Sequence, residues 1–305
     1  MMGYFSQTVI DALSWGGLYA LAALGIGLLY GVLRVINFAH GDFITVGAFS
    51  LIVPSTQATA QLALGALPAP LLIIGTLLVV TLVALLSDLL VFRPLRGATP
   101  STIMIASFAL GYVIQNIVLL LYSSRPKAVD LWPELNEAFG FAGLRIPQLQ
   151  IWTVTVAALL MVALTVFLKA SSYGIEMRAA SEDLRMARLL GVRANRVIAL
   201  AVALSGALAG AVSLIIATQS GVVSYQMGGP VMLFAFIGTI IGGMGSLVGS
   251  ALGGFAVGFS SVILQAYLPD DIRPFRDAIL FALVILILVI RPQGLILVKT
   301  MRERV

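Results

Sequence analysis

Three polar side chains lie within six residues of an otherwise apolar stretch: Asn37, His40 and Asp42. At the centre of a bilayer an aspartate costs about 2.5–3.5 kcal/mol, so its side chain must face protein or a water-filled path. Such residues are candidates for a path through the membrane or for its gate. A structural interpretation also stands, in which Asn37 caps a helix start, His40 packs inside the protein and Asp42 hydrogen-bonds a neighbouring helix. Residues 37 and 41 share one helix face, whereas His40 and Asp42 project at different angles, so these side chains cannot all face one pore.

A second group of polar residues lies in the loop 169–196, and its composition predicts one short helix from residue 181 to residue 191. A serine suits the N-cap, two acids suit the first turn, and a glycine suits the left-handed C-terminal position. Two arginines lie off the apolar stripe of this helix. The helix is too short to be stable alone, so it must rest either on the membrane surface or on a cytoplasmic subunit. The residues concerned are Ser181, Glu182, Asp183, Arg185, Arg188 and Gly191.

Composition places the chain in a membrane. Of the 305 residues, 60% are hydrophobic and 10% are charged, and the mean hydropathy is +1.07. The absence of cysteine and the single histidine exclude disulfides, thiolate ligands and histidine–cysteine metal clusters. The sequence contains no GxxxxGK[ST] phosphate loop and no catalytic constellation, so no enzymatic activity is expected of this chain. With Asp42 as the one deep carboxylate, coupling to protons or sodium is poorly supported.

The elements that position these groups are predicted to be membrane-spanning helices in an all-α bundle. Eight or nine crossings are expected over 9–33, 36–53, 70–92, 101–122, 149–168 and 275–290, with up to three more in the uncharged stretch 197–269. Turns are expected near 221–230 and 242–246, and the crossing over 231–245 is short. With the N-terminus outside, thirteen of the 18 lysines and arginines face inward, which favours an N-out, C-in orientation.

Glycines at four-residue spacing predict close helix packing in the second half of the chain. Small residues four apart line one face of a helix and let two backbones approach. The alternative is that residues 237–258 line a moving interface or an unwound stretch around a path. The glycines singled out here are Gly242, Gly245, Gly249 and Gly253.

Four motifs together resemble the permeases of branched-chain amino-acid ABC importers, and more narrowly the shorter of the two permeases that pair in such a system. They are GVLRVINFAHGD at 31–42, AASEDLRMARLLG at 179–191 followed by RVIAL at 196–200, IGGMGSLVGS at 241–250, and RPQGL at 291–295.

The resemblance implies one permease domain over residues 1–305 in a bacterial inner membrane. It also implies partners: a second, similar permease, two cytoplasmic ATPases that bind ATP and magnesium, and an external substrate-binding protein. No cofactor is expected in this chain. Solutes of relatives extend from branched-chain amino acids to urea, short amides, and aromatic or dicarboxylic acids. A stand-alone carrier or channel is the remote alternative.

The loop 169–196 holds the position of the helix that couples such permeases to their ATPases. The general importer pattern Glu-Ala-Ala-x-x-x-Gly is degenerate here, since counting back from Gly191 only Ala187 fits, and Arg185 and Met186 stand at the first two positions. The resemblance therefore predicts the docking element without assigning its individual contacts.

Overall fold

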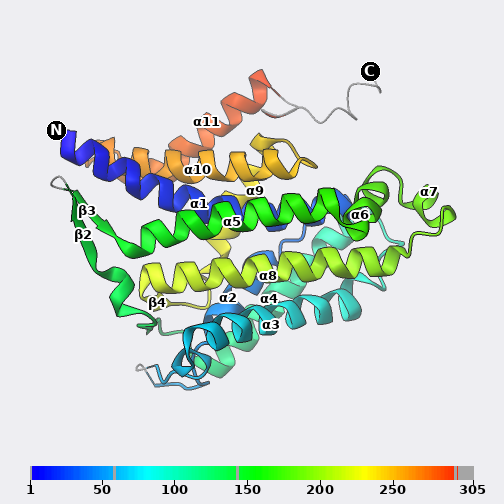
Figure 1. The fold of residues 1–305 in the computed structure, drawn as a ribbon, viewed down its shortest axis with the longest axis horizontal. Helices are drawn as coiled ribbons and strands as arrows, with labels where there is room; N and C mark the ends of the chain where they lie inside the picture. The colour runs from blue at the N-terminus through cyan, green and yellow to red at the C-terminus, as the bar shows by residue number, and fades with distance from the viewer. Residues whose placement is uncertain (1, 58–59, 142–143, 292–293, 295–305) are drawn as a thin grey trace. The chain divides into compact units, whose positions relative to one another are not determined.

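The computed structural model describes residues 2–57, 60–141, 144–291 and 294. The described α-helices are α1 (Met2–Leu33), α2 (His40–Phe49), α3 (Ala69–Ser87), α4 (Pro100–Tyr122), α5 (Gln148–Ala170), α6 (Ser172–Glu182), α7 (Leu184–Leu189), α8 (Ala194–Ser220), α9 (Gly228–Gly242), α10 (Leu247–Tyr267) and α11 (Arg276–Ile290) (Figure 1). A π-helical turn continues α3 over Asp88–Phe92, and 3-10 turns occupy Leu64–Ala66, Pro133–Asn136 and Arg273–Phe275.

Six of the described helices are long and apolar enough to cross a membrane: α1, α3 with its π-helical turn, α4, α5, α8 and α10. Helices α9 and α11 have 15 residues each, which corresponds to a rise of about 22 Å. The turns predicted near 221–230 and 242–246 lie between α8, α9 and α10.

The predicted crossing over 36–53 is wrong as a continuous helix, because α2 has ten residues and a rise of about 15 Å. The chain turns over 34–39 before α2 begins, and Pro54, which cannot continue a helix, lies just beyond its end.

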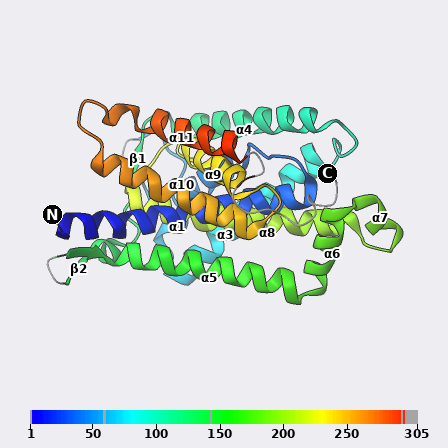
Figure 2. The ribbon, with the colours of Figure 1, turned by 90° about the horizontal axis from the view of Figure 1, so that it is seen from above.

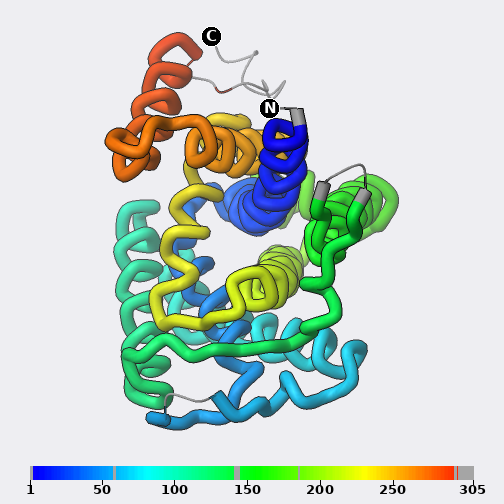
Figure 3. Tube along the Cα trace, turned by 90° about the vertical axis from the view of Figure 1, so that its left-hand side faces the viewer, coloured from blue at the N-terminus to red at the C-terminus, as the bar shows by residue number. Residues whose placement is uncertain are grey.

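The prediction of a helical fold is confirmed for most of the described chain, which also contains two small β-pairs. Strands β2 (Ala138–Phe141) and β3 (Leu144–Pro147) form an antiparallel hairpin, in which Phe139 lies opposite Ile146. Strand β1 (Lys127–Ala128) pairs with β4 (Val222–Val223), and Figure 3 shows this extended chain beside the turn that follows α8. Three prolines between residues 126 and 147 disfavour helix there.

The chain forms two compact units that interleave along the sequence. Unit 1 comprises Met1–Gly27, Trp132–Val162 and Leu233–Val305, and unit 2 comprises Leu28–Leu131 and Ala163–Met232. Three of the four boundaries fall inside α1, α5 and α9, and the fourth lies between Leu131 and Trp132, so each unit consists of segments that are distant in sequence.

Unit 1 is built on close backbone approaches between α1, α9 and α10. Figure 2 shows α1 and α10 side by side, and at Gly254 a side chain would overlap Tyr19 and Ala23 of α1. Tyr19 also packs on Phe234, with ring centroids 5.3 Å apart. At the other helix pair, Gly238 of α9 lies against Gly254 of α10. Van der Waals contact of this kind replaces the hydrophobic drive in lipid.

Unit 2 has α3 and α8 packed along each other, with α2 against α3, α4 and α8 (Figure 1). Gly206 and Gly210 of α8 face α3, where a Cβ would crowd Ala84 and Leu77 respectively. Gly47 of α2 packs on Ser213 of α8 in the same way. This packing fixes where the polar side chains of α2 point.

Candidate functional site

The turn between α1 and α2 is built around Arg34 and Asn37. Arg34 ends α1 with a left-handed backbone (φ 55°), and its Nη2 donates to the carbonyl of Ser181 at 2.8 Å. Asn37 accepts the Ala39 N–H on its side-chain oxygen at 3.1 Å, which forms a turn one residue before α2 begins. Asn37 therefore does not cap α2 as predicted but stabilises the turn before it, and the N-cap residue is Ala39.

Asp42 points from α2 towards α4 and is 6% exposed. Its Oδ1 accepts a hydrogen bond from Gln115 Nε2 at 2.7 Å. Its Oδ2 lies over Gly111, where a Cβ would overlap it. The carboxylate thus accepts from the Gln115 amide on a helix face cleared by a glycine.

His40 points the other way, into α8, and is fully buried. Its Nδ1 lies 3.2 Å from Ser205 Oγ, and its Nε2 has no hydrogen-bond partner within the described part of the chain. Asn37, His40 and Asp42 therefore have three different surroundings, and the structure does not bring them to one surface.

The start of α2 is also tied to α4 by Phe38. Its backbone N–H donates to Ser107 Oγ at 3.1 Å, and its ring stacks on Phe108 with centroids 4.0 Å apart. Together with the contact of Asp42 with Gln115, these interactions link the polar segment to α4 at both ends.

The loop predicted as one helix from Ser181 to Gly191 is divided in two, which corrects that prediction. Ser181 and Glu182 form the last residues of α6, where Ser181 Oγ donates to the Arg178 carbonyl at 2.7 Å. The N-cap of α7 is Asp183, whose Oδ1 accepts the Met186 N–H at 3.0 Å. Asp183 has extended backbone geometry, so the helix breaks there and starts again.

The end of α7 is as predicted. Gly191 has a φ of 91°, and its N–H donates to the Arg188 carbonyl while that of Val192 donates to the Ala187 carbonyl. This pair of bonds closes the helix in the left-handed glycine manner. Ala187 is 2% exposed and Leu189 is 81% exposed, so α7 has one buried face and one open face. The side chain of Arg185 lies outside the described structure.

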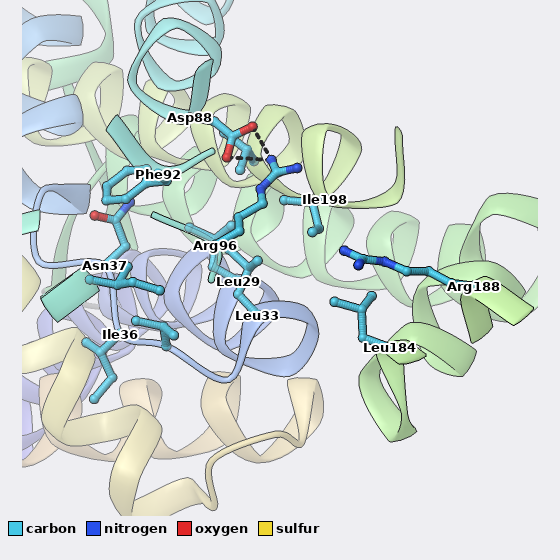
Figure 4. Close-up of a pocket in the computed structure, with 13 residues that line it drawn as sticks. Leu29, Leu33, Ile36, Asn37, Asp88, Phe92, Arg96, Leu184, Arg188 and Ile198 are labelled. Atoms are coloured by element: carbon cyan, nitrogen blue, oxygen red, sulfur yellow. Dashed lines mark hydrogen bonds and ion pairs between the residues drawn. The ribbon is translucent and has the colours of Figure 1, made fainter. Parts of the chain in front are cut away.

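A cavity of about 110 Å³ lies beside α7 in unit 2 (Figure 4). Its polar wall holds an ion pair in which Arg96 Nη2 donates to both Asp88 oxygens at 2.8 and 2.6 Å. Arg96 Nη1 donates to Asn195 Oδ1 at 2.6 Å, which ties the turn after α3 and its π-helical segment to the start of α8. The lining residues are Leu29, Leu33, Val35, Ile36, Asn37, Asp88, Phe92, Arg96, Ile103, Leu184, Arg188, Ile198 and Val202.

Of the four glycines predicted to pack helices, three lie at the contact between α9 and α10. Gly242 lies against Gly249, and Gly253 against Gly242 and the Gly238 carbonyl, too close for side chains. Gly245 is different, because it lies in the turn between the helices with a φ of 96°. Its role is to let the chain reverse, which a glycine does without steric cost.

Among the described residues no group of three or more histidine, cysteine or acidic side chains could hold a metal ion. The sequence-based prediction did not name Gln115, Ser205 or the Asp88–Arg96 pair. An amide inside an apolar helix was the available signal for Gln115. The ion pair had a weaker signal, because its partners are eight residues apart across a turn.

Comparisons with known proteins identify the family of this chain. A family model described as "Branched-chain amino acid transport system / permease component" matches residues 8–288. The high-affinity branched-chain amino acid transport permease BraD of Pseudomonas aeruginosa is 31% identical over 298 residues, and LivH of Escherichia coli K12 is 30% identical over 299. In both cases the match covers 96% of this chain and 96% of the relative. This chain therefore belongs to the permease family of branched-chain amino acid transport systems.

Proposed function

We propose that this chain is the translocating subunit of an ATP-driven importer and that its cargo is a branched-chain amino acid. The observation that carries the proposal is the family match over residues 8–288 together with full-length relatives that are named as such permeases. The chain supplies part of the membrane path and no nucleotide site of its own.

The orientation we propose is N-out and C-in, with eight transmembrane helices. The six long helices and the shorter α9 and α11 are these eight, and α2, with ten residues, is too short to cross. Within unit 2, one end carries Arg34, Arg96 and the loop 169–196, and the other carries Lys127. The arginine-rich end is the cytoplasmic one by the excess of positive charge. Residues 295–305, which supply further basic residues, lie outside the described structure.

The partners we propose are a second permease of the same family, two ATPases that bind ATP and magnesium, and an external binding protein. Support for ATPase docking comes from α7, a six-residue helix with an open apolar face at Leu189 and Leu190. A helix this short gains its stability from whatever covers it. The alternative to ATPase docking is that α7 lies on the membrane surface.

Within the permease we assign Asp42 and Gln115 to the translocation path or its gate. A carboxylate with one amide partner, buried among apolar helices, is a costly arrangement in lipid. Asn37 borders the cavity beside α7, and His40 supports the packing of α2 on α8.

The test is uptake by the complete system in proteoliposomes. We expect ATP-dependent uptake of radiolabelled leucine, isoleucine or valine that requires the binding protein and both permeases. Parallel assays with urea, acetamide, benzoate and succinate identify the cargo class. Uptake of one of these solutes in place of the amino acids would contradict the assignment of the cargo as a branched-chain amino acid. Uptake by this chain alone without ATP would contradict the whole proposal.

A further inference from the structure

The cavity beside α7 combines apolar walls with a small group of polar and charged side chains. Nine of its 13 lining side chains are aliphatic or aromatic, and the remaining four are Asn37, Asp88, Arg96 and Arg188. Leucine, isoleucine and valine predominate among the nine. A cavity with apolar walls and a few convergent polar groups is the usual form of a small-molecule site.

The charges of this cavity do not cancel. Asp88 is matched by Arg96, whose two hydrogen bonds occupy both carboxylate oxygens. Arg188 has no ion-pair partner within the described residues, so the cavity keeps one positive charge. In addition, the buried Nε of Arg96 has no hydrogen-bond acceptor there. Two guanidinium groups thus have donors to spare, and a carboxylate is the group that accepts from guanidinium best.

The arrangement in Figure 4 separates the polar and apolar parts. Arg188 extends from α7 towards Ile198 and Arg96 on one side, and Asn37 lies on the opposite side, with Leu29 and Leu33 between them. A ligand whose carboxylate lies between the two arginines would place its other end against leucine, isoleucine and valine side chains.

The volume limits the size of the ligand. At about 10–15 Å³ for each water-sized group, 110 Å³ holds roughly seven to eleven non-hydrogen atoms. Valine, leucine and isoleucine have this size, and so do the 2-oxo acids formed when they lose their amino group. A fatty acyl chain of a membrane lipid is too large to be enclosed.

We propose that this cavity binds a short, branched aliphatic carboxylate. The identification of that carboxylate as the imported amino acid, or as its deaminated 2-oxo acid, rests on the proposed function. Bound there, the carboxylate joins Arg188 of α7 to Arg96, which is itself joined to Asn195 of α8. The ligand therefore restrains α7, so cargo accumulated in the cytoplasm slows further import.

The direct test uses the absence of cysteine from this chain. Leu184→Cys places one thiol on the cavity wall, and Tyr173→Cys on α6 is a matched control that does not line the cavity. Each variant is assembled with its partners in lipid nanodiscs without the binding protein, and alkylation of this chain by a maleimide is followed on gels. We expect leucine or 4-methyl-2-oxopentanoate to slow labelling of the Leu184→Cys variant at least several-fold and to leave labelling of the Tyr173→Cys variant unaffected. The ligand that slows labelling more shows whether the bound carboxylate is the amino acid or its 2-oxo acid.

The chemistry is checked by 3-methylbutylamine, which has the branched chain and lacks the carboxylate. It should protect the thiol at position 184 at least about tenfold less well, as expected for the loss of a charge-assisted hydrogen bond. In the Leu184→Cys background, Arg188→Gln and the cavity-filling Val202→Phe should each weaken protection by a similar factor, and Arg196→Gln, an exposed arginine outside the cavity, should not. Asp42→Asn should leave protection unchanged, because it alters the membrane path.

Regulation is read separately from proteoliposomes loaded with leucine or the 2-oxo acid on the cytoplasmic side. Initial uptake should fall with internal ligand, and the Val202→Phe complex should lose this sensitivity. Equal protection by the amine, or no protection by either carboxylate in an assembled complex, overturns the inference. Absence of leucine uptake by the unmodified complete system overturns the proposed function instead, and leaves the protection result to stand on its own.

Discussion

At the scale of single residues, the surroundings of Asp42 separate a structural role from a functional one. Its Oδ1 accepts from Gln115, and an asparagine oxygen in the same place can accept the same hydrogen bond. The substitution removes the charge at little cost to local structure. Retaining a charge in a membrane segment costs a few kcal/mol, so a purely structural residue would gain from its removal.

We therefore expect Asp42→Asn to keep near-normal expression and assembly and to lower uptake at least several-fold. His40→Ala provides the contrast, because it removes a fully buried side chain and its contact with Ser205. The His40→Ala variant should have a clearly lower thermal stability as a purified complex, whereas its uptake per assembled complex should change less. Uptake in vesicles normalised to complex abundance decides the point. Full uptake by an intact Asp42→Asn complex would return the segment 37–42 to a structural role.

Gly111 offers a second test of the same carboxylate. A Cβ at this position would overlap Asp42 Oδ2, so Gly111→Ala must displace the carboxylate from Gln115. We expect reduced uptake and a destabilisation of about 1–3 kcal/mol from overpacking.

The matched control is Gly31→Ala in α1, where no atom of the described residues lies within 4 Å of an added Cβ. This change should be neutral or slightly stabilising, since alanine favours helix more than glycine does. Thermal unfolding in detergent and vesicle uptake measure both variants. Equal behaviour of the two would show that the position of the Asp42 carboxylate has no consequence.

At the scale of elements, the break between α6 and α7 determines the direction in which α7 extends. Asp183 ends one helix and caps the next, so its carboxylate sets the direction of α7. Loss of an N-cap costs about 1 kcal/mol, which is large for a helix of six residues.

Asp183→Ala should therefore reduce ATP hydrolysis stimulated by the binding protein, and Asp183→Ser should restore most of it because serine also caps. The comparison of alanine with serine isolates capping from charge. If both variants hydrolyse ATP at the unmodified rate, the position of α7 does not depend on this cap.

The arginines of α7 carry a further prediction on docking. Replacing both Arg185 and Arg188 by Glu reverses two charges on a helix that faces the proposed ATPase. We expect less co-purified ATPase or less stimulated hydrolysis, because the helix has no core of its own. Arg193→Glu together with Arg196→Glu, beyond the end of α7, is the control for a general charge effect. Unchanged assembly and turnover in the α7 double variant would remove ATPase docking from the proposal.

At the scale of the whole molecule, the chain shows one set of membrane helices and no duplication in its sequence. Each of its two compact units is built from segments that are distant in sequence. The membrane path is therefore expected between this chain and a second permease.

The corresponding prediction is that this chain, purified and reconstituted alone, transports no amino acid. Addition of the second permease, the ATPases, ATP and the binding protein should restore uptake. Equal assays with the second permease omitted provide the control. Transport by the chain alone, in the absence of ATP, would contradict the prediction and favour a stand-alone carrier.

The sequence by itself determined the class of protein, the positions of six long helices, the turns on either side of α9 and the glycine that ends α7. These features follow from local rules. A membrane requires about 20 apolar residues per crossing, basic residues mark the cytoplasmic ends, and a left-handed position favours glycine.

Only the tertiary structure decided which polar groups meet. Gln115 is 73 positions from Asp42, and Ser205 is 165 positions from His40. The break at Asp183, the short α2 and the cavity between Arg96 and Arg188 likewise depend on which helix faces touch. Hydrophobic periodicity cannot predict these pairings, because in lipid both faces of a helix are apolar and the choice of neighbour rests on shape complementarity and a few hydrogen bonds.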